Sequence, residues 1–455
     1  MKFVRVYCSV FSFLLVAAAG AAEPLPLSAN YWKDEAFLKS FNGSYRVNAR
    51  IEPVVSTEER GLLVSIQKLM AEGKRDDALK KLTASALMKT SAAVAFNAGN
   101  IQFELGDLKE AAAHYESALK IFPSFRRAHR NLGFVYVRDN DWDKALASLS
   151  EAVRLGDQDG ATYGQLAYGR MHKEQYASAL QAFRLAQITQ PESIDWKAGV
   201  AQCLQHLQRN EEALTLLDEV IAARPKEVSY YLLQASIQIA MDRSDDAITN
   251  LDLVRRLGQL DAENHLLLAN LHLRAGSARL ARPVLMAALA MDDKPPMVAT
   301  LNALEFITQT RDWVLARDFA AATEKAYEDT KGKLEQKQRR LTALIQIESG
   351  EDPKSGAATL EKLIKADPLD ADSLVLLGRC RVTEKRYEEA EMLFQQAQRV
   401  EGHEYKASIE LAKLHVATGR YTDALKQLDE ALKIQNSKQI QTYRDAVANL
   451  ANASR

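Results

Sequence analysis

Arg127, Arg130 and Phe134 are the residues whose types and spacing best suit a chemical task, the recognition of an acidic polypeptide. The arginines are three residues apart and Phe134 follows one helical turn later, so all three side chains can point from one helix face. A partly desolvated guanidinium binds a carboxylate through two parallel hydrogen bonds, and an aromatic ring adds contact area. We therefore interpret this stretch as a candidate surface for an acidic protein segment.

Motifs of catalysis are missing from the sequence. It contains no glycine-rich phosphate loop, no His-Glu-x-x-His, no Gly-x-Ser-x-Gly and no paired-cysteine metal knuckle. The histidines are scattered, except that His172 and His206 are 34 residues apart. No further metal ligands accompany that pair, so we expect neither a metal nor a cofactor. A non-enzymatic protein is favoured, and an enzyme with a site hidden in a groove is the rival interpretation.

A 34-residue repeat organises most of the chain. In the stretch 92–125, small and large apolar residues alternate at helical spacing with a single break at Gly106-Asp107, which predicts two antiparallel helices joined by a tight turn. Steps of 34 residues lead from Ala111 to an alanine in each of the next units, and we call these six the marker alanines: Ala111, Ala145, Ala179, Ala213, Ala247 and Ala281. The register then slips by one residue to Ala316 and by six residues to Gly356.

This pattern resembles the tetratricopeptide repeat family, whose period and alternation of small and large residues it matches. The resemblance implies an all-α, right-handed α-solenoid of about eleven helix pairs over residues 58–434, with the marker alanines buried between helices. Residues 435–455 are expected to form a capping helix and a tail. The resemblance also implies that the first helix of each pair lines a concave face that binds a protein or peptide partner.

The early units provide the candidate partner-binding groove when each first helix is projected onto that face. The family's carboxylate clamp is not expected, because Asn100 and Asn131 match its asparagines but Phe96, Ala161 and Gln165 replace its basic residues. An alternative remains open, in which the phenylalanines pack between helices and the arginines are only solvated. The groove residues are aromatic, basic or amide-bearing: Phe96, Asn100, Phe103, Arg127, Arg130, Asn131, Phe134, Arg138, Tyr168, His172, Gln202 and His206.

Residues 1–22 have the pattern of a signal peptide. Lys2 and Arg5 precede an apolar run, which ends in small residues directly before Glu23. We expect export, to the periplasm of a bacterium, with no transmembrane anchor after cleavage. Removing Lys2 and Arg5 from the 59 basic residues leaves 57 against 60 acidic ones, a formal charge of −3. That balance argues against nucleic acid as a general partner.

Residues 23–57 do not follow the repeat. Trp32, Ala36, Phe37 and Phe41 could form one apolar helix face, which we interpret as a cap over the exposed end of the repeat array, with a docking element as the alternative. The stretch FNGSYRVN followed by Glu52-Pro53 resembles the entry segment of exported repeat proteins associated with TonB-type energy-transducing systems. The resemblance implies an accessory role in such a system. An adaptor in surface-polymer export or outer-membrane assembly is the alternative.

Two further features concern the array itself. The charge run from Lys331 to Arg340 coincides with the six-residue slip, so we expect a solvated helix extension or loop there, with a basic partner-binding patch as the alternative. Cys203 and Cys380 occupy the same inward position of units far apart in the array. They are therefore expected to be buried free thiols and not a disulfide.

Overall fold

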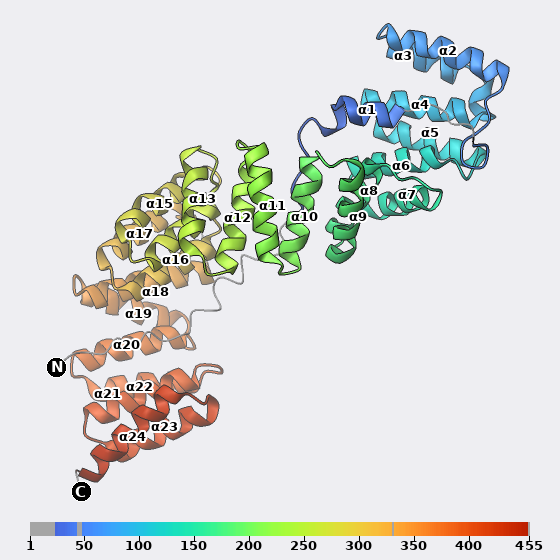
Figure 1. The fold of residues 1–455 in the computed structure, drawn as a ribbon. Coiled ribbons are helices and arrows are strands. Elements are labelled where there is room, and N and C mark those ends of the chain that lie inside the picture. Colours follow the sequence, from blue (N-terminus) through green and yellow to red (C-terminus); the bar gives the residue numbers. More distant parts are fainter. Residues whose placement is uncertain (1–22, 43–47, 330–331, 454–455) are drawn as a thin grey trace. The chain divides into compact units, whose positions relative to one another are not determined.

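The computed structural model describes residues 23–42, 48–329 and 332–453, which form helices and connecting turns with no strand among them. The chain forms two compact units, Met1–Asn250 and Leu251–Arg455, whose helices are labelled in Figure 1. The expected signal peptide, residues 1–22, lies outside the described residues, as do residues 43–47 of the TonB-like stretch. No helix of the described ranges has the length and apolar character needed to cross a membrane.

The first unit opens with a short 3-10 helix, η3 (Tyr31–Lys33), and with α1 (Glu35–Asn42), both upstream of the repeats. A second short 3-10 helix, η4 (Ala86–Lys89), lies between the first two pairs. First and second helices then alternate along the chain: α2 (Thr57–Ala71), α3 (Arg75–Thr83), α4 (Ala92–Leu105), α5 (Leu108–Ile121), α6 (Arg126–Arg138), α7 (Trp142–Arg154), α8 (Gly160–His172), α9 (Tyr176–Thr189), α10 (Ile194–His206), α11 (Asn210–Ala223), α12 (Val228–Ala240) and α13 (Ser244–Arg256), the last of which spans the unit boundary.

The second unit continues the alternation and ends in a single helix. Its helices are α14 (Ala262–Arg274), α15 (Ala278–Ala290), α16 (Met297–Thr310), α17 (Trp313–Ala326), α18 (Lys333–Ser349), α19 (Pro353–Ala366), α20 (Ala371–Thr383), α21 (Tyr387–Gln398), α22 (Glu404–Ala417), α23 (Tyr421–Ile434) and α24 (Lys438–Ala453). Ile440 and Val447 of α24 are buried in a cluster with Leu428 of α23. The helices α2 to α23 make eleven consecutive pairs, so the predicted all-α solenoid fold is confirmed.

Capping residues explain where the helices begin and end. Ser91 accepts a hydrogen bond from the Val94 amide at the start of α4, and Asp107 does the same for Glu110 at the start of α5. Between them Gly106 adopts a left-handed conformation with φ of 88°. The same conformation recurs at 34-residue steps, at Asn140, Glu174, Gln208 and Asp242. The predicted tight turn is therefore present in each of these units, even where no glycine provides it.

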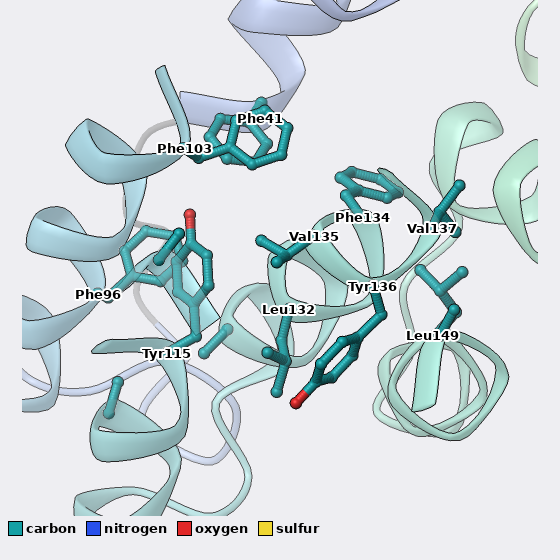
Figure 2. Close-up of a cluster of buried hydrophobic side chains, with 14 of the residues drawn as sticks. Phe41, Phe96, Phe103, Tyr115, Leu132, Phe134, Val135, Tyr136, Val137 and Leu149 are labelled. Atoms are coloured by element: carbon teal, nitrogen blue, oxygen red, sulfur yellow. The ribbon is translucent and has the colours of Figure 1, made fainter. Parts of the chain in front are cut away.

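The core depends on small residues at the crossing of the two helices in a pair. All six marker alanines are 0% exposed, as predicted. On the first helix, a Cβ atom added at Gly99 would lie 2.7 Å from the Tyr115 ring, and one added at Gly133 would lie 2.5 Å from the Leu149 side chain. Figure 2 shows Tyr115 and the equivalent Leu149 within the buried cluster of the early units. The helices of a pair can therefore approach closely only where the side chains are small.

A longer helix accommodates part of the six-residue slip. The helix α18 has 17 residues, whereas α17 and α19 have 14 each. Part of the charge run is therefore helical, and three of its cations form ion pairs: Lys337 with Glu305 at 2.9 Å, Arg339 with Glu335 at 2.6 Å and Arg340 with Asp370 at 2.9 Å. Lys331 itself is outside the described residues. These ion pairs argue against a free basic patch at this place.

Substitution of Ala179 by leucine should lower the free energy of unfolding by about 1–3 kcal/mol, because the larger side chain overpacks the crossing of α8 and α9. Ala177 provides a matched control, since it lies on the same helix but is exposed. Ala177→Leu should leave stability within about 0.5 kcal/mol of the wild type. Denaturant unfolding followed by circular dichroism compares the two, and equal losses would contradict the repeat register.

Candidate functional site

The candidate residues lie on the surface formed by the first helices α4, α6, α8 and α10, which we call the first-helix face. This face is not empty, because residues 23–42, which we call the N-terminal segment, lie against it. Figure 1 shows α1 beside α4, and hydrogen bonds and ring contacts link the segment to α4, α6 and α10. The interpretation of this segment as a cap over the end of the array is therefore wrong. An apolar helix face does not specify which apolar surface it will cover.

Aromatic rings form the contact between α1 and the first-helix face. The Phe41 ring lies 4.5 Å from the Phe103 ring, centroid to centroid, and the Phe37 ring lies 5.6 Å from the Phe134 ring. Trp32 adds an edge contact to Phe103 at 6.1 Å. Phe41 is 0% exposed, and Figure 2 shows it stacked against Phe103. Such pairs stabilise by about 0.5–1.5 kcal/mol beyond the burial of their area.

Polar side chains of α6 bind the end of α1, and a side chain of α4 supports one of them. Asn131 and Arg130 donate hydrogen bonds to the Phe41 carbonyl oxygen at 3.3 and 3.4 Å. That carbonyl belongs to the last turn of α1, where helix acceptors have no partner within the helix. Asn131 also donates to the Asn100 side chain at 3.0 Å, and the Tyr115 hydroxyl donates to the same oxygen at 2.7 Å. The network holds the Asn131 amide in place to receive the helix end.

The extended part of the N-terminal segment is bound by α10. The side-chain amide of Gln202 accepts from the Leu25 amide at 2.7 Å and donates to the Glu23 carbonyl at 2.8 Å. Asp195 accepts from the Ser28 amide at 3.2 Å and from the Ser28 hydroxyl at 3.1 Å. Arg224 holds the Asp195 carboxylate at 2.7 Å. The backbone of the segment is thus held by hydrogen bonds at two points, Leu25 and Ser28, three residues apart.

Apolar contacts fill the space between these polar points. Leu25 and Leu27 line a small cavity of about 10 Å³ together with Tyr168, Met171 and Phe183. Tyr31 packs its ring 5.6 Å from that of Trp196, and burial raises the pKa of its hydroxyl above the ordinary value. The segment therefore fits this part of the face closely.

Arg127 has a role that the sequence did not reveal. Its guanidinium Nε lies 2.9 Å from a carboxylate oxygen of Glu52, and the two residues are 5% and 3% exposed. Arg130 is also buried, at 6%. The expectation that these arginines are surface residues is therefore wrong, since the carboxylate beside Arg127 comes from the chain itself. Glu52 is 75 residues upstream in a part that does not repeat, so no periodic signal connects it to Arg127.

The remaining predicted residues lie behind or beside the segment. Phe96 is buried against Phe125, with ring centroids 4.8 Å apart. Arg138 is exposed, lies over the Phe103 ring and donates to the Phe103 carbonyl at 3.3 Å. Asp195 and Trp196 were not predicted. The sequence held one indication of their role, the many apolar and aromatic residues between Leu25 and Phe41, which require an apolar surface to cover them.

His172 and His206 stack on aromatic rings. The His172 ring lies 3.8 Å from Trp142 and the His206 ring 3.9 Å from Tyr176, both nearly parallel. Burial lowers the pKa of both imidazoles, and the carboxylates of Glu23 and Glu174 respectively oppose that shift. Within the described residues no group of three or more His, Cys, Asp or Glu side chains could hold a metal ion. We therefore regard both imidazoles as packing groups of the helix pairs.

Cys203 and Cys380 are free and buried, as predicted. Burial raises the pKa of the Cys203 thiol to about 12, so the thiol stays protonated at neutral pH. It follows Gln202 in α10 but provides no nucleophile there. The position is structural, as expected for a small apolar side chain in a helix crossing.

The corresponding surface of the second compact unit, formed by its first helices, has a different character. Its helices α18, α20 and α22 are joined by ion pairs, Lys406 with Asp372 at 2.7 Å and Arg379 with Glu410 at 2.7 Å. Arg340 of α18 also lies 3.5 Å from Asp372. This face is charged, whereas the face in the first unit carries rings and amides.

These features define a helical-repeat protein, and sequence comparison supports the family. A family model described as "TPR repeat" matches residues 99–140, and models described as "Tetratricopeptide repeat" match residues 170–237, 348–404 and 381–450. Together with the eleven helix pairs, these matches support assignment of the repeats to the tetratricopeptide repeat family. Tetratricopeptide repeats generally form non-catalytic scaffolds for protein–protein interaction.

Curated relatives match only part of the chain. Superkiller protein 3 of Schizosaccharomyces pombe is 30% identical over 115 residues, which are 25% of this chain and 8% of that protein. The TPR repeat-containing protein YpiA of Bacillus subtilis is 28% identical over 124 residues, 27% of this chain and 29% of that protein. The chain thus spans less than a third of the length of either relative.

Solved structures are similar at low identity. A tetratricopeptide repeat protein from Parabacteroides merdae is 18% identical, covers 56% of this chain and 98% of its own, and has a TM-score of 0.37. YrrB, described as a TPR protein with an unusual peptide-binding site, is 21% identical, covers 41% of this chain and 89% of its own, and has a TM-score of 0.34.

Substitution of Arg127 by alanine should lower the free energy of unfolding by about 3–5 kcal/mol, because the buried Glu52 would lose its closest cation and keep only the Arg126 guanidinium at 3.7 Å. Arg127→Met combined with Glu52→Gln should recover much of the loss, since both charges are removed together. Arg154→Ala is the control, because Arg154 also pairs with a glutamate but its side chain is 68% exposed. Denaturant unfolding measures all three variants. Equal losses for Arg127→Ala and Arg154→Ala would show that the Glu52 pair is not a buried contact.

Stability should fall on acidification through His172 and His206. Their folded-state pKa values are lowered from 6.5, so the folded state binds fewer protons than the unfolded state. The contribution is present above about pH 6.5 and is lost as the pH falls through the lowered folded-state values. His172→Phe with His206→Phe retains the ring contacts and should weaken the decline in unfolding free energy between pH 7 and pH 5. An unchanged pH dependence would exclude these imidazoles as its source.

Proposed function

We propose that this chain is an exported, non-enzymatic tetratricopeptide repeat scaffold that binds protein segments in the cell envelope. One observation carries the proposal: the first-helix face of the first unit holds a polypeptide segment through its backbone as well as its side chains. Gln202 forms hydrogen bonds with the backbone on both sides of residue 24, and Asn131 donates one to the Phe41 carbonyl at the end of α1. These are the contacts with which a protein surface recognises a peptide.

Aromatic anchors support the same proposal. Phe103 and Phe134 lie one helix pair apart and both contact rings of α1. Buried aromatic contacts near the centre of an interface usually provide most of its binding energy. The face thus combines anchors for apolar side chains with polar groups that fix the position of the backbone.

The proposed location of the protein, in the periplasm, rests on the amino-terminal sequence. Lys2 and Arg5, the apolar run and the small residues before Glu23 together support export to a bacterial periplasm. The first bonded atom of the N-terminal segment, the Glu23 carbonyl, directly follows the expected cleavage site. The proposed accessory role in a TonB-type system rests on the stretch FNGSYRVN and Glu52-Pro53, of which Glu52 also pairs with Arg127.

Export predicts a mature chain that begins at Glu23. A carboxy-terminally tagged full chain expressed in a bacterial host should be recovered from the periplasmic fraction, and amino-terminal sequencing should read Glu-Pro-Leu-Pro. Lys2→Glu with Arg5→Glu should leave the uncleaved precursor in the cytoplasm, because the positive start of the signal is removed. Recovery of the wild-type precursor with its first 22 residues from the cytoplasm would refute export.

Partner binding at the first-helix face predicts site-specific crosslinking. A photo-reactive amino acid at Arg138, which is exposed beside Phe103, should capture an envelope protein in living cells. The same amino acid at the exposed Lys120 on α5 is the matched control and should not capture it. Capture of no protein at Arg138, or of the same proteins at both positions, would contradict the proposed site.

A further inference from the structure

The N-terminal segment is attached to the repeats as a ligand is attached to a receptor. It contributes no helix to any repeat pair, and the crossings in the pairs are completed without it, Gly99 by Tyr115 and Gly133 by Leu149. Of its described side chains only Phe37 and Phe41 are buried, while the others remain partly or fully exposed. Withdrawal of the segment would therefore expose the first-helix face without opening the crossings inside the helix pairs.

Three kinds of contact specify what fits this face. An extended stretch packs Leu25 and Leu27 against the buried cluster that contains Met171 and Phe183, and its backbone forms hydrogen bonds with Gln202. A hydroxyl and an amide three residues later bind Asp195. A short helix then presents two phenylalanines four residues apart, on one helix face, to Phe103 and Phe134.

We propose that the N-terminal segment is an internal ligand of the first-helix face and that a partner protein binds there by displacing it. The inference rests on the proposed function, since it names the site and the chemistry of the partner. The partner segment has the pattern of residues 25–41: apolar residues in extended conformation, then a short helix with two aromatic residues four positions apart. The free face is the state that binds the partner.

An occupied face lowers the apparent affinity for any competing segment. The apparent dissociation constant rises in inverse proportion to the fraction of molecules in which the face is free. Loosening the internal ligand without touching the face should therefore tighten binding of a segment supplied in trans. Phe37→Ala with Phe41→Ala is suited to this, because both side chains belong to the segment and not to a repeat.

A synthetic peptide of residues 23–42 with a fluorescent label is the probe. The full chain without substitutions should bind it weakly, and the Phe37→Ala, Phe41→Ala variant should bind it at least about 10-fold more tightly by fluorescence anisotropy. Adding Gln202→Ala to that variant should weaken the binding again, because Leu25 and Glu23 of the peptide lose their backbone contact. A peptide of scrambled sequence is the negative control. Failure of the loosened variant to bind the peptide more tightly than the wild type overturns the inference.

Hydrogen exchange of the unsubstituted chain tests displacement without any variant. The amides of Leu25 and Ser28, which donate to Gln202 and Asp195, should exchange faster than those of Leu132 and Val135 inside α6. Such a difference shows that the segment leaves while the repeats stay folded. Exchange of all four amides at a single common rate of opening would make the segment a fixed part of the fold and would overturn the inference.

A second copy of the chain could also occupy the first-helix face in place of a partner protein, and its binding must be distinguished from that of a partner. Light scattering of the wild type over a range of concentrations should show no new dimer that depends on Phe37 and Phe41. A dimer that disappears in the Phe37→Ala, Phe41→Ala variant would mean exchange of segments between copies and would overturn the partner proposal. The proposed function is tested separately, because crosslinking at Arg138 can capture an envelope protein even where the peptide is never displaced.

Discussion

The close approach of two helices at a small residue is the contact on which the rest of the structure depends. At Gly99, Gly133 and Gly378 even a methyl group would lie 2.4–2.7 Å from the side chain that crosses there. Because the same contact recurs in unit after unit, each pair has nearly the same geometry. The first helices thereby follow one another in register, and equivalent positions of successive units point to the same side.

That register produces the first-helix face. Phe103 and Phe134 come from neighbouring helix pairs, and Gln202 comes from a helix pair two further along the chain. The three act on one bound segment although no two are close in sequence. A helix-pair array thus converts a periodic sequence into a row of binding positions, and the side chains at those positions decide what is recognised. In the first unit these side chains favour an apolar and aromatic polypeptide, whereas those of the second unit form ion pairs with one another.

The sequence predicted the helix pairs and most of the face, because both depend on periodic position. Asn131, Phe134 and Gln202 were identified from their places in the repeat, and the structure brings them to one surface. It did not predict what lies on that surface, because the N-terminal segment has no period and meets its contacts far away in the chain. Arg127 was misjudged for the same reason, since a helical position shows which way a side chain points but not whether a distant carboxylate covers it.

The Glu52–Arg127 ion pair has a consequence for the strength of the internal contact. It fixes Ile51 and Glu52 at the start of α6, where Arg126 also donates its amide to the Ile51 carbonyl, so the N-terminal segment, which ends at Asn42, is joined to a fixed point close by in the chain. A short tether keeps the effective concentration of the segment at its site high, on the order of millimolar, and lengthening the tether dilutes it. If the carboxylate of a partner replaced that of Glu52 at Arg127, the chain would be released as far as Thr57, where α2 begins. The tether would then be longer, and the N-terminal segment would bind the first-helix face more weakly. The charge of a partner and its aromatic residues would then act on the same equilibrium from two separate places.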